Sequence, residues 1–332
     1  MKKNITKYLL LALACLGLQS CLFQEENYFD DSSANRATAD VSRCGELLKG
    51  APNGWVMEYY VGKDYSLGGI TLLCRFDGQR VTMASQMSEA DETVSSLYSV
   101  KSEQATMLSF DTYNYLVHYF GQPQGSMSDD PNGTLGGDYE FIISSASAER
   151  IELKGKKYGN RIVMKALTED QTWKQYLTKI KKVEDDAFFY EYDLLMDGLY
   201  TGQMIRSNYT FIVTYYDEIG KVHQKTVPFM FTADGLRFHE PVTIDGQTMQ
   251  NFVWKNELIS FVCTDEGATG VKLAGVYTAG YQSYDYYPGT YQMDFYRLND
   301  ETGQLEVASQ EVRLLKNEDG KSYWLKGLEY DI

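Results

Sequence analysis

The sequence predicts a mainly β protein of antiparallel strands, with one helix near the start and a second in the middle of the chain. Apolar residues alternate with a period of two over many short segments rich in Val, Ile, Tyr and Phe, as in half-buried strands. Gly, Asp and Asn turns separate these segments, and the connections are too short for parallel crossovers. The expected architecture is therefore a β-meander folded into sandwich or barrel-like modules.

The first predicted helix covers residues 33–49. Ser32 or Ser33 can cap its N-terminus, and Gly50 and Pro52 close it.

Eight short strands are expected after this helix, and Asp77-Gly78 is a tight hairpin signal between two of them. Each strand is rich in β-branched and aromatic residues. The expected strands are 55–61, 70–76, 80–84, 97–100, 107–110, 139–144, 150–153 and 161–166.

The second predicted helix begins at Thr168, whose hydroxyl can cap the helix while the Gln171 side chain reaches back. Its apolar stripe is expected to dock on the sheet and consists of Trp173, Tyr176, Leu177 and Ile180.

Strands resume near residue 198, where residues 209–235 and 291–320 follow the same order of strand, turn and Asp-Gly hairpin. Residues 59–78 look like a looser third copy. This pattern indicates an internal repeat of hairpins, although any two β-meanders can align in this way.

The chain therefore divides into five expected regions. They are a lipoprotein signal peptide (1–20), a flexible tether (21–32), an N-terminal helix with a β-module (33–167), a connecting helical segment (168–197) and a second β-region (198–332).

The N-terminus carries the most specific motif. Lys2 and Lys3 precede an apolar run over residues 8–18, which ends in Leu18-Gln-Ser-Cys21. This is the pattern of a secretory signal with a lipobox, and the run is too short to span about 30 Å of hydrocarbon. We expect Cys21 to carry the lipid that anchors the protein to a membrane. The alternative is an ordinary signal peptide with a chance cysteine.

The net charge and the number of cysteines indicate which partners and which cysteine chemistry to expect. The net charge of -15 argues against nucleic acid as a partner, because phosphate backbones would be repelled. Beyond the signal and the lipid site, three cysteines remain, at Cys44, Cys74 and Cys263, each in phase with an apolar stripe. We expect buried free thiols, because an odd number cannot all pair internally.

No recognisable catalytic motif is present, and we expect no catalytic residues, metal or cofactor. His239-Glu240 lacks the second histidine of a zinc protease helix, and Pro241 forbids that helix. The acidic loop at residues 129–133 is typical of a solvated turn rather than a calcium loop. A carboxylate pair for glycoside hydrolysis stays open, because its separation is invisible in a sequence.

A tyrosine-rich loop is the candidate ligand-binding site. Tyr281, Tyr284, Tyr286 and Tyr287 lie among Gly, Ser, Asp and Pro residues. Exposed tyrosines stack on sugar rings and contact peptides at low entropic cost, so a glycan or a peptide would fit. The alternative is that these rings cover a barrel end or an edge strand.

Four segments together resemble a family of Bacteroidetes lipoproteins grouped as domain of unknown function 4302. They are Gly54-Trp55, residues 108–120 (LSFDTYNYLVHYF), residues 136–141 (GGDYEF) and residues 153–157 (LKGKK). The resemblance implies a surface lipoprotein accessory to uptake, because genes of this family tend to lie beside SusC/SusD-like nutrient importers. Members are commonly longer at the C-terminus, which implies that the last module here is incomplete.

Residues 22–26 (LFQEE) are similar to the acidic tags that export such lipoproteins to the outer face of the outer membrane. We therefore expect an outer-membrane, surface-exposed lipoprotein that acts as a non-catalytic binding or accessory protein in glycan or peptide capture. Its expected partners are the membrane, through the N-terminal lipid, and a SusC/SusD-like complex. The alternative is a glycan or peptide hydrolase without a recognisable motif.

Overall fold

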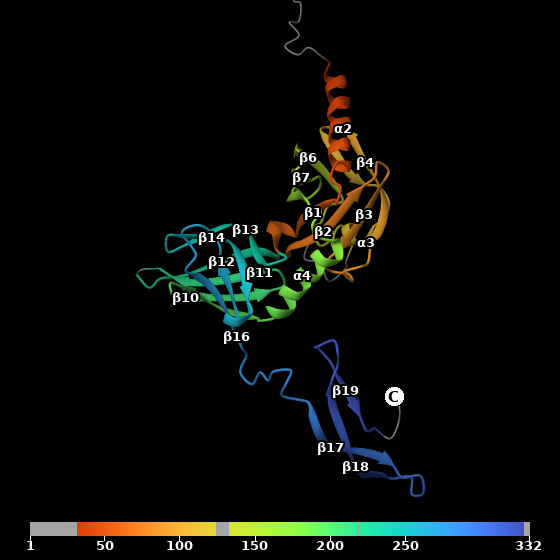
Figure 1. The fold of residues 1–332 in the computed structure, drawn as a ribbon, viewed down its shortest axis with the longest axis vertical. Helices are drawn as coiled ribbons and strands as arrows, with labels where there is room; N and C mark the ends of the chain where they lie inside the picture. Colours follow the sequence, from red (N-terminus) through yellow and green to blue (C-terminus); the bar gives the residue numbers. More distant parts are fainter. Residues whose placement is uncertain (1–31, 124–132, 218, 329–332) are drawn as a thin grey trace, which may run out of the picture. The chain divides into compact units, whose positions relative to one another are not determined.

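The computed structural model describes residues 32–123, 133–217 and 219–328. Antiparallel strands form two closed barrels of eight strands each and a further three-stranded sheet (Figure 1). The predicted fold class, mainly β with antiparallel barrel-like modules and few helices, is confirmed. The chain divides into two compact units, 1–275 and 276–332.

Helix α2 (Ser33–Lys49) precedes the first barrel. The Ser32 hydroxyl accepts a hydrogen bond from the Asn35 amide at 3.2 Å, which caps the helix as the sequence predicted. At the other end, the Trp55 indole donates to the Leu48 carbonyl at 2.8 Å and ties the helix to the first strand.

The first barrel runs in chain order from β1 to β8 and closes by pairing β1 with β8. All eight predicted strands are present. The short helices η2 (Lys63–Tyr65) and α3 (Tyr115–His118) lie in its connections. The strands are β1 (Trp55–Val61), β2 (Gly68–Phe76), β3 (Arg80–Ser85), β4 (Val94–Ser102), β5 (Thr106–Phe110), β6 (Glu140–Ala146), β7 (Arg150–Gly155) and β8 (Arg161–Ala166).

Two of the segments that carry the family resemblance meet at the buried Asp138 carboxylate. It accepts hydrogen bonds from the amides of Lys157 at 2.7 Å and Tyr158 at 3.0 Å. A side chain at Gly155 would collide with the Asp138 carboxylate, so this strand position requires glycine. These contacts of Asp138 therefore tie the two segments together within the barrel.

Strand β1 is buried on both faces. Trp55 and Tyr59 point into the core of the first barrel. Val56, with Leu73 and Ala84 from the neighbouring strands, belongs to the core cluster of the second barrel. Packing on two sides explains why this segment is an almost continuous apolar run.

Helix α4 (Trp173–Asp186) connects the barrels, and its start differs from the prediction. Thr172 caps it: the Thr172 hydroxyl accepts from the Gln175 amide at 3.2 Å, and the Gln175 side chain accepts from the Thr172 amide at 2.9 Å. The predicted cap at Thr168 with Gln171 is wrong, although it has the same spacing. The Asn53 side chain binds the carbonyls of both residues, at 2.7 and 2.8 Å, and holds them outside the helix.

The predicted docking face of α4 is confirmed at its centre, because Leu177 and Ile180 are fully buried in the core cluster of the second barrel. Trp173 and Tyr176 pack partly buried against the same cluster.

The second barrel consists of β9 to β16, with β9 pairing between β10 and β16. Its core is aromatic: the rings of Phe211 and Phe229 stack at 4.4 Å between centroids. Helix η4 (Asn256–Leu258) precedes β15. The strands are β9 (Glu191–Met196), β10 (Leu199–Ser207), β11 (Thr210–Tyr216), β12 (Val222–Phe231), β13 (Gly235–Ile244), β14 (Gln247–Lys255), β15 (Ser260–Cys263) and β16 (Val271–Val276).

The last strands form a sheet of their own, in the order β17 (Gly289–Leu298), β18 (Leu305–Lys316) and β19 (Tyr323–Lys326). The sequence placed them in one β-region over 198–332, whereas the structure separates them from the second barrel. The two segments of the expected repeat are indeed both meanders, β11 to β13 and β17 to β19, but one is part of a closed barrel and the other is not.

The three cysteines beyond residue 21 are buried free thiols, as predicted. Burial raises the pKa of Cys263 to about 11 and that of Cys74 further, so these groups stay protonated and pack as small apolar side chains.

Candidate functional site

The sites predicted from the sequence fall in different places. Cys21 and residues 129–132 of the acidic loop lie outside the described residues. The tyrosine-rich loop lies in the unit 276–332, between β16 and β17.

Tyr284 has a structural role within this unit. Its hydroxyl donates to the Ser322 carbonyl at 2.6 Å and accepts from the Asn317 amide at 3.0 Å. Its ring stacks on Tyr323 at 4.7 Å, and the Tyr323 hydroxyl donates to the Tyr284 carbonyl at 2.8 Å. These contacts fasten the loop to the turn between β18 and β19.

The other three rings are exposed, at 41% for Tyr281, 62% for Tyr286 and 43% for Tyr287. Tyr286 and Tyr287 pack edge to face at 5.2 Å. The structure thus separates one anchoring tyrosine from three rings that a ligand could reach.

Tyr284→Ala should lower the stability of the unit 276–332 by about 2 kcal/mol or more, because it removes a packed ring and its hydrogen bonds. The matched substitution Tyr286→Ala should change the stability of this unit by no more than about 0.5 kcal/mol, because that ring is largely exposed. Hydrogen exchange of the β18 and β19 amides measures both effects. Equal protection in the two variants would contradict the anchoring role of Tyr284.

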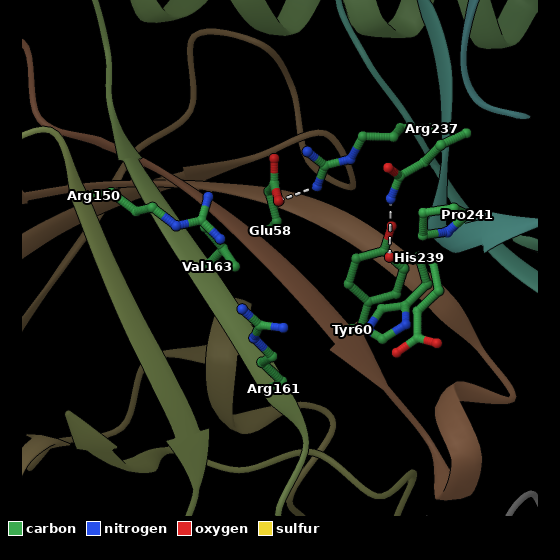
Figure 2. A pocket seen from close by; sticks show the side chains of 10 residues that line it. Glu58, Tyr60, Arg150, Arg161, Val163, Arg237, His239 and Pro241 are labelled. Carbon is green, nitrogen blue, oxygen red and sulfur yellow. Dashed lines mark hydrogen bonds and ion pairs between the residues drawn. The ribbon is translucent and has the colours of Figure 1, made fainter. Parts of the chain in front are cut away.

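A polar cleft of about 390 Å³ lies between the two barrels (Figure 2). The first barrel contributes residues of β1, β7 and β8, and the second contributes residues of β13 and β14. Side chains that alternate along one strand share a face, which places Glu58 and Tyr60 together on β1. Its lining includes Glu58, Tyr60, Arg150, Arg161, Arg237 and His239.

The second-barrel wall is built on an irregular strand. The register of β13 against β14 shifts between Arg237 and Val242. Arg237, His239, Glu240 and Pro241 of this stretch all line the cleft. Such irregularities re-aim side chains, and here they face the first barrel.

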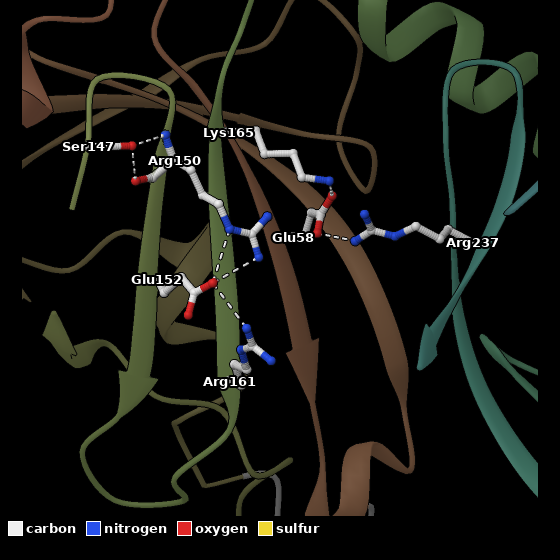
Figure 3. A network of polar contacts seen from close by, with 7 residues as sticks. All are labelled: Glu58, Ser147, Arg150, Glu152, Arg161, Lys165 and Arg237. Carbon is white, nitrogen blue, oxygen red and sulfur yellow. Dashed lines mark hydrogen bonds and ion pairs between the residues drawn. The ribbon is translucent and has the colours of Figure 1, made fainter. Parts of the chain in front are cut away.

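Two carboxylates each hold two cations around the cleft (Figure 3). One oxygen of the buried Glu58 binds Lys165 of β8 at 2.8 Å, and the other binds Arg237 of the second barrel. Glu152 binds both Arg150 and Arg161, each at 3.0 Å. Each carboxylate thus faces twice its own charge, which leaves an excess of positive charge.

Two buried polar atoms beside this network have no hydrogen-bond partner among the described residues. They are the Tyr60 hydroxyl and the Arg237 Nε. Tyr60 is only 3% exposed. Burial raises the pKa of Tyr60 well above its ordinary value, against the smaller lowering effect of the neighbouring Arg237 guanidinium, so the hydroxyl keeps its proton and can donate it.

His239 completes the wall. Its ring lies 4.4 Å from that of Tyr60 and 3.9 Å from that of Tyr65, measured between centroids. Burial lowers the pKa of His239, so the ring is neutral at pH 7. A smaller hollow of about 220 Å³ shares His239, Glu240 and Pro241 as lining residues.

A third hollow, of about 550 Å³, lies beside the start of α4, and none of the buried polar atoms found without a partner among the described residues lines it. The Trp173 indole donates to the Asn53 carbonyl at 2.8 Å, and the Asn53 amide binds two further carbonyls. Buried donors without partners distinguish the cleft between the barrels from this hollow.

The sequence did not predict the cleft, and His239-Glu240 resembled only a fragment of a zinc motif. The available signal was Glu58, a lone charge inside the apolar run 55–61, because a carboxylate there needs a cationic partner. The sequence alone does not say that the partner is Arg237.

Comparison with known families identifies the family of this chain. Residues 25–256 match the family described as "Domain of unknown function (DUF4302)". The chain belongs to this family. Residues 264–332 match a second family, DUF4987, also described as a domain of unknown function. The DUF4302 match contains every lining residue of the cleft, and the tyrosine-rich loop lies in the DUF4987 match.

A search of curated proteins finds no match. Among solved structures, a mosquitocidal holotoxin is similar at 7% identity and a TM-score of 0.14, over 83% of this chain and 42% of the other. A DNA polymerase III subunit beta sliding clamp from Bartonella birtlesii is similar at 9% identity and a TM-score of 0.11, over 72% of this chain and 66% of the other. The chain spans less than two thirds of either structure, and neither likeness bears on its function.

Two further findings concern the described part of this DUF4302 chain. Within the described ranges, no three His, Cys, Asp or Glu side chains gather in a way that could hold a metal ion. No helix among the same residues has the length and apolarity that a membrane crossing needs.

Proposed function

We propose that this protein is a lipid-anchored, surface-exposed protein of the outer membrane that binds a glycan or peptide nutrient without converting it. In this proposal Cys21 carries the lipid, and the protein acts as an accessory to a SusC/SusD-like importer. The lipobox and the resemblance to Bacteroidetes lipoproteins support the location. One observation carries the binding role: the polar cleft between the barrels contains buried donors that the fold itself leaves unpartnered.

The geometry of the cleft favours binding over hydrolysis. A glycosidase needs one carboxyl group that can give a proton to the leaving group. Both oxygens of Glu58 already accept hydrogen bonds from cations, Lys165 and Arg237. This carboxylate is therefore engaged in ion pairs, which leaves Glu240 as the other carboxyl group of the cleft lining, whereas glycoside hydrolysis uses a pair.

The location is tested by Cys21→Ala, which removes the thiol that lipidation requires. We expect unprocessed precursor or released protein, whereas the matched variant Cys15→Ala within the same signal should stay anchored. Membrane fractionation measures anchoring, and protease digestion of intact cells measures exposure. Protection of the wild-type protein in intact cells would place it in the periplasm and contradict the surface assignment.

The binding role is tested with the full lipid-anchored chain, extracted in detergent and exposed to a panel of glycans and oligopeptides. We expect at least one class to be retained and to be recovered with its length unchanged. Chromatography of the recovered ligand measures turnover. Shortened products would favour the hydrolase alternative and contradict the proposal, as would failure to retain any member of the panel.

A further inference from the structure

We propose that the cleft between the two barrels binds a sugar acid, whose carboxylate takes hydrogen bonds from Tyr60, Arg161 and Arg237. This inference rests on the proposed binding function and names the class of ligand.

The charge around the cleft is opposite to that of the chain. Overall, acids outnumber bases by 46 to 31. Around the cleft, Glu58 and Glu152 face four cations, and Glu240 at the rim adds only one more carboxylate. A local excess of cations within an acidic protein attracts an anion to this place and not to the surrounding surface.

The donors are arranged for a ligand that brings its own acceptors. A buried polar group without a partner destabilises the folded state, and natural folds rarely keep one without a reason. Here two such groups, the Tyr60 hydroxyl of the first barrel and the Arg237 Nε of the second, line one cleft side by side, and neither makes a hydrogen bond of ordinary geometry although the two side chains interact electrostatically. A carboxylate has two oxygens and accepts several hydrogen bonds, so a single carboxylate can satisfy both groups.

The rest of the cleft indicates more than a simple inorganic ion. Its volume of about 390 Å³ lies in the range of small-molecule sites, about 300–1,000 Å³. The exposed Glu240 carboxylate can accept protons from hydroxyl groups, and neutral His239 can accept or donate one hydrogen bond. Val163 and Pro241 supply apolar contacts. Donors for a carboxylate beside acceptors for hydroxyls match a hydroxylated acid better than an acidic peptide.

The test measures binding of D-glucuronate to the full lipid-anchored chain in detergent by calorimetry, with glucose, inorganic sulfate and an acidic dipeptide as comparison ligands. We expect glucuronate to bind at least about tenfold more tightly than each of the other three, because only glucuronate joins a carboxylate to a hydroxylated ring.

Tyr60→Phe removes only the buried hydroxyl and keeps the ring that packs on His239. We expect the affinity for glucuronate to fall about tenfold or more, the effect of losing a hydrogen bond to a charged group. The melting temperature of the ligand-free protein should stay the same or rise, because the buried hydroxyl makes no hydrogen bond of ordinary geometry within the fold. The matched control is Thr71→Val, which removes another buried, unpartnered hydroxyl that does not line the cleft and should keep the affinity.

A second pair of variants tests the charge. Arg161→Gln removes an exposed cleft cation and should weaken glucuronate binding several-fold, with little effect on folding. The matched control is Arg80→Gln, which removes the same single positive charge from β3, outside the lining of the cleft. It should leave the affinity for glucuronate unchanged.

Other outcomes overturn the inference. Equal binding of sulfate would reduce the cleft to a general oxyanion site, and preference for glucose or the dipeptide would assign another ligand class. A fall of several degrees in the melting temperature of Tyr60→Phe would show that its hydroxyl is bonded within the fold. No binding of glucuronate would also overturn it, whereas the proposed binding function would still stand if the wider panel yields a ligand.

Discussion

The buried Glu58 carboxylate links the two barrels through an ion pair. It projects from a strand that is otherwise apolar on both faces, and it is only 7% exposed. A carboxylate is costly to bury unless cations share the site. Lys165 meets this need from the neighbouring strand, and Arg237 meets it from the second barrel. The same ion pair that links the barrels therefore forms one side of the cleft between them.

The cleft is polar because the contact between the barrels changes character along β1. Near Val56 the outer face packs in a shared apolar core with α4 and the second barrel. From Glu58 to Tyr60 the same face meets charged and aromatic side chains of β13 instead. The fold keeps unpartnered donors there, at a cost in stability that is typical of binding sites. Sites between modules are common because each module fixes its own wall.

Local patterns predicted the elements, and long-range contacts decided what the sequence could not show. The eight strands of the first barrel and the cap at Ser32 follow from periodicity and turn residues. Thr168 and Thr172 fit the same capping pattern, and Asn53, far away in the sequence, decides between them. Barrel closure and the separate final sheet depend on which strands pair. The periodicity of apolar residues identifies the strands but not their pairing partners. The cleft was hidden for the same reason, because Glu58 and Arg237 lie on different barrels.

The most direct measurement is a crystal structure of the protein with bound D-glucuronate. The account predicts density for the sugar between the barrels, with its carboxylate within hydrogen-bond distance of the Tyr60 hydroxyl and the Arg237 Nε, and with the Glu58 ion pairs intact. A sugar bound elsewhere, for example on the exposed tyrosines of the loop at 281–287, with the cleft unchanged, would contradict it.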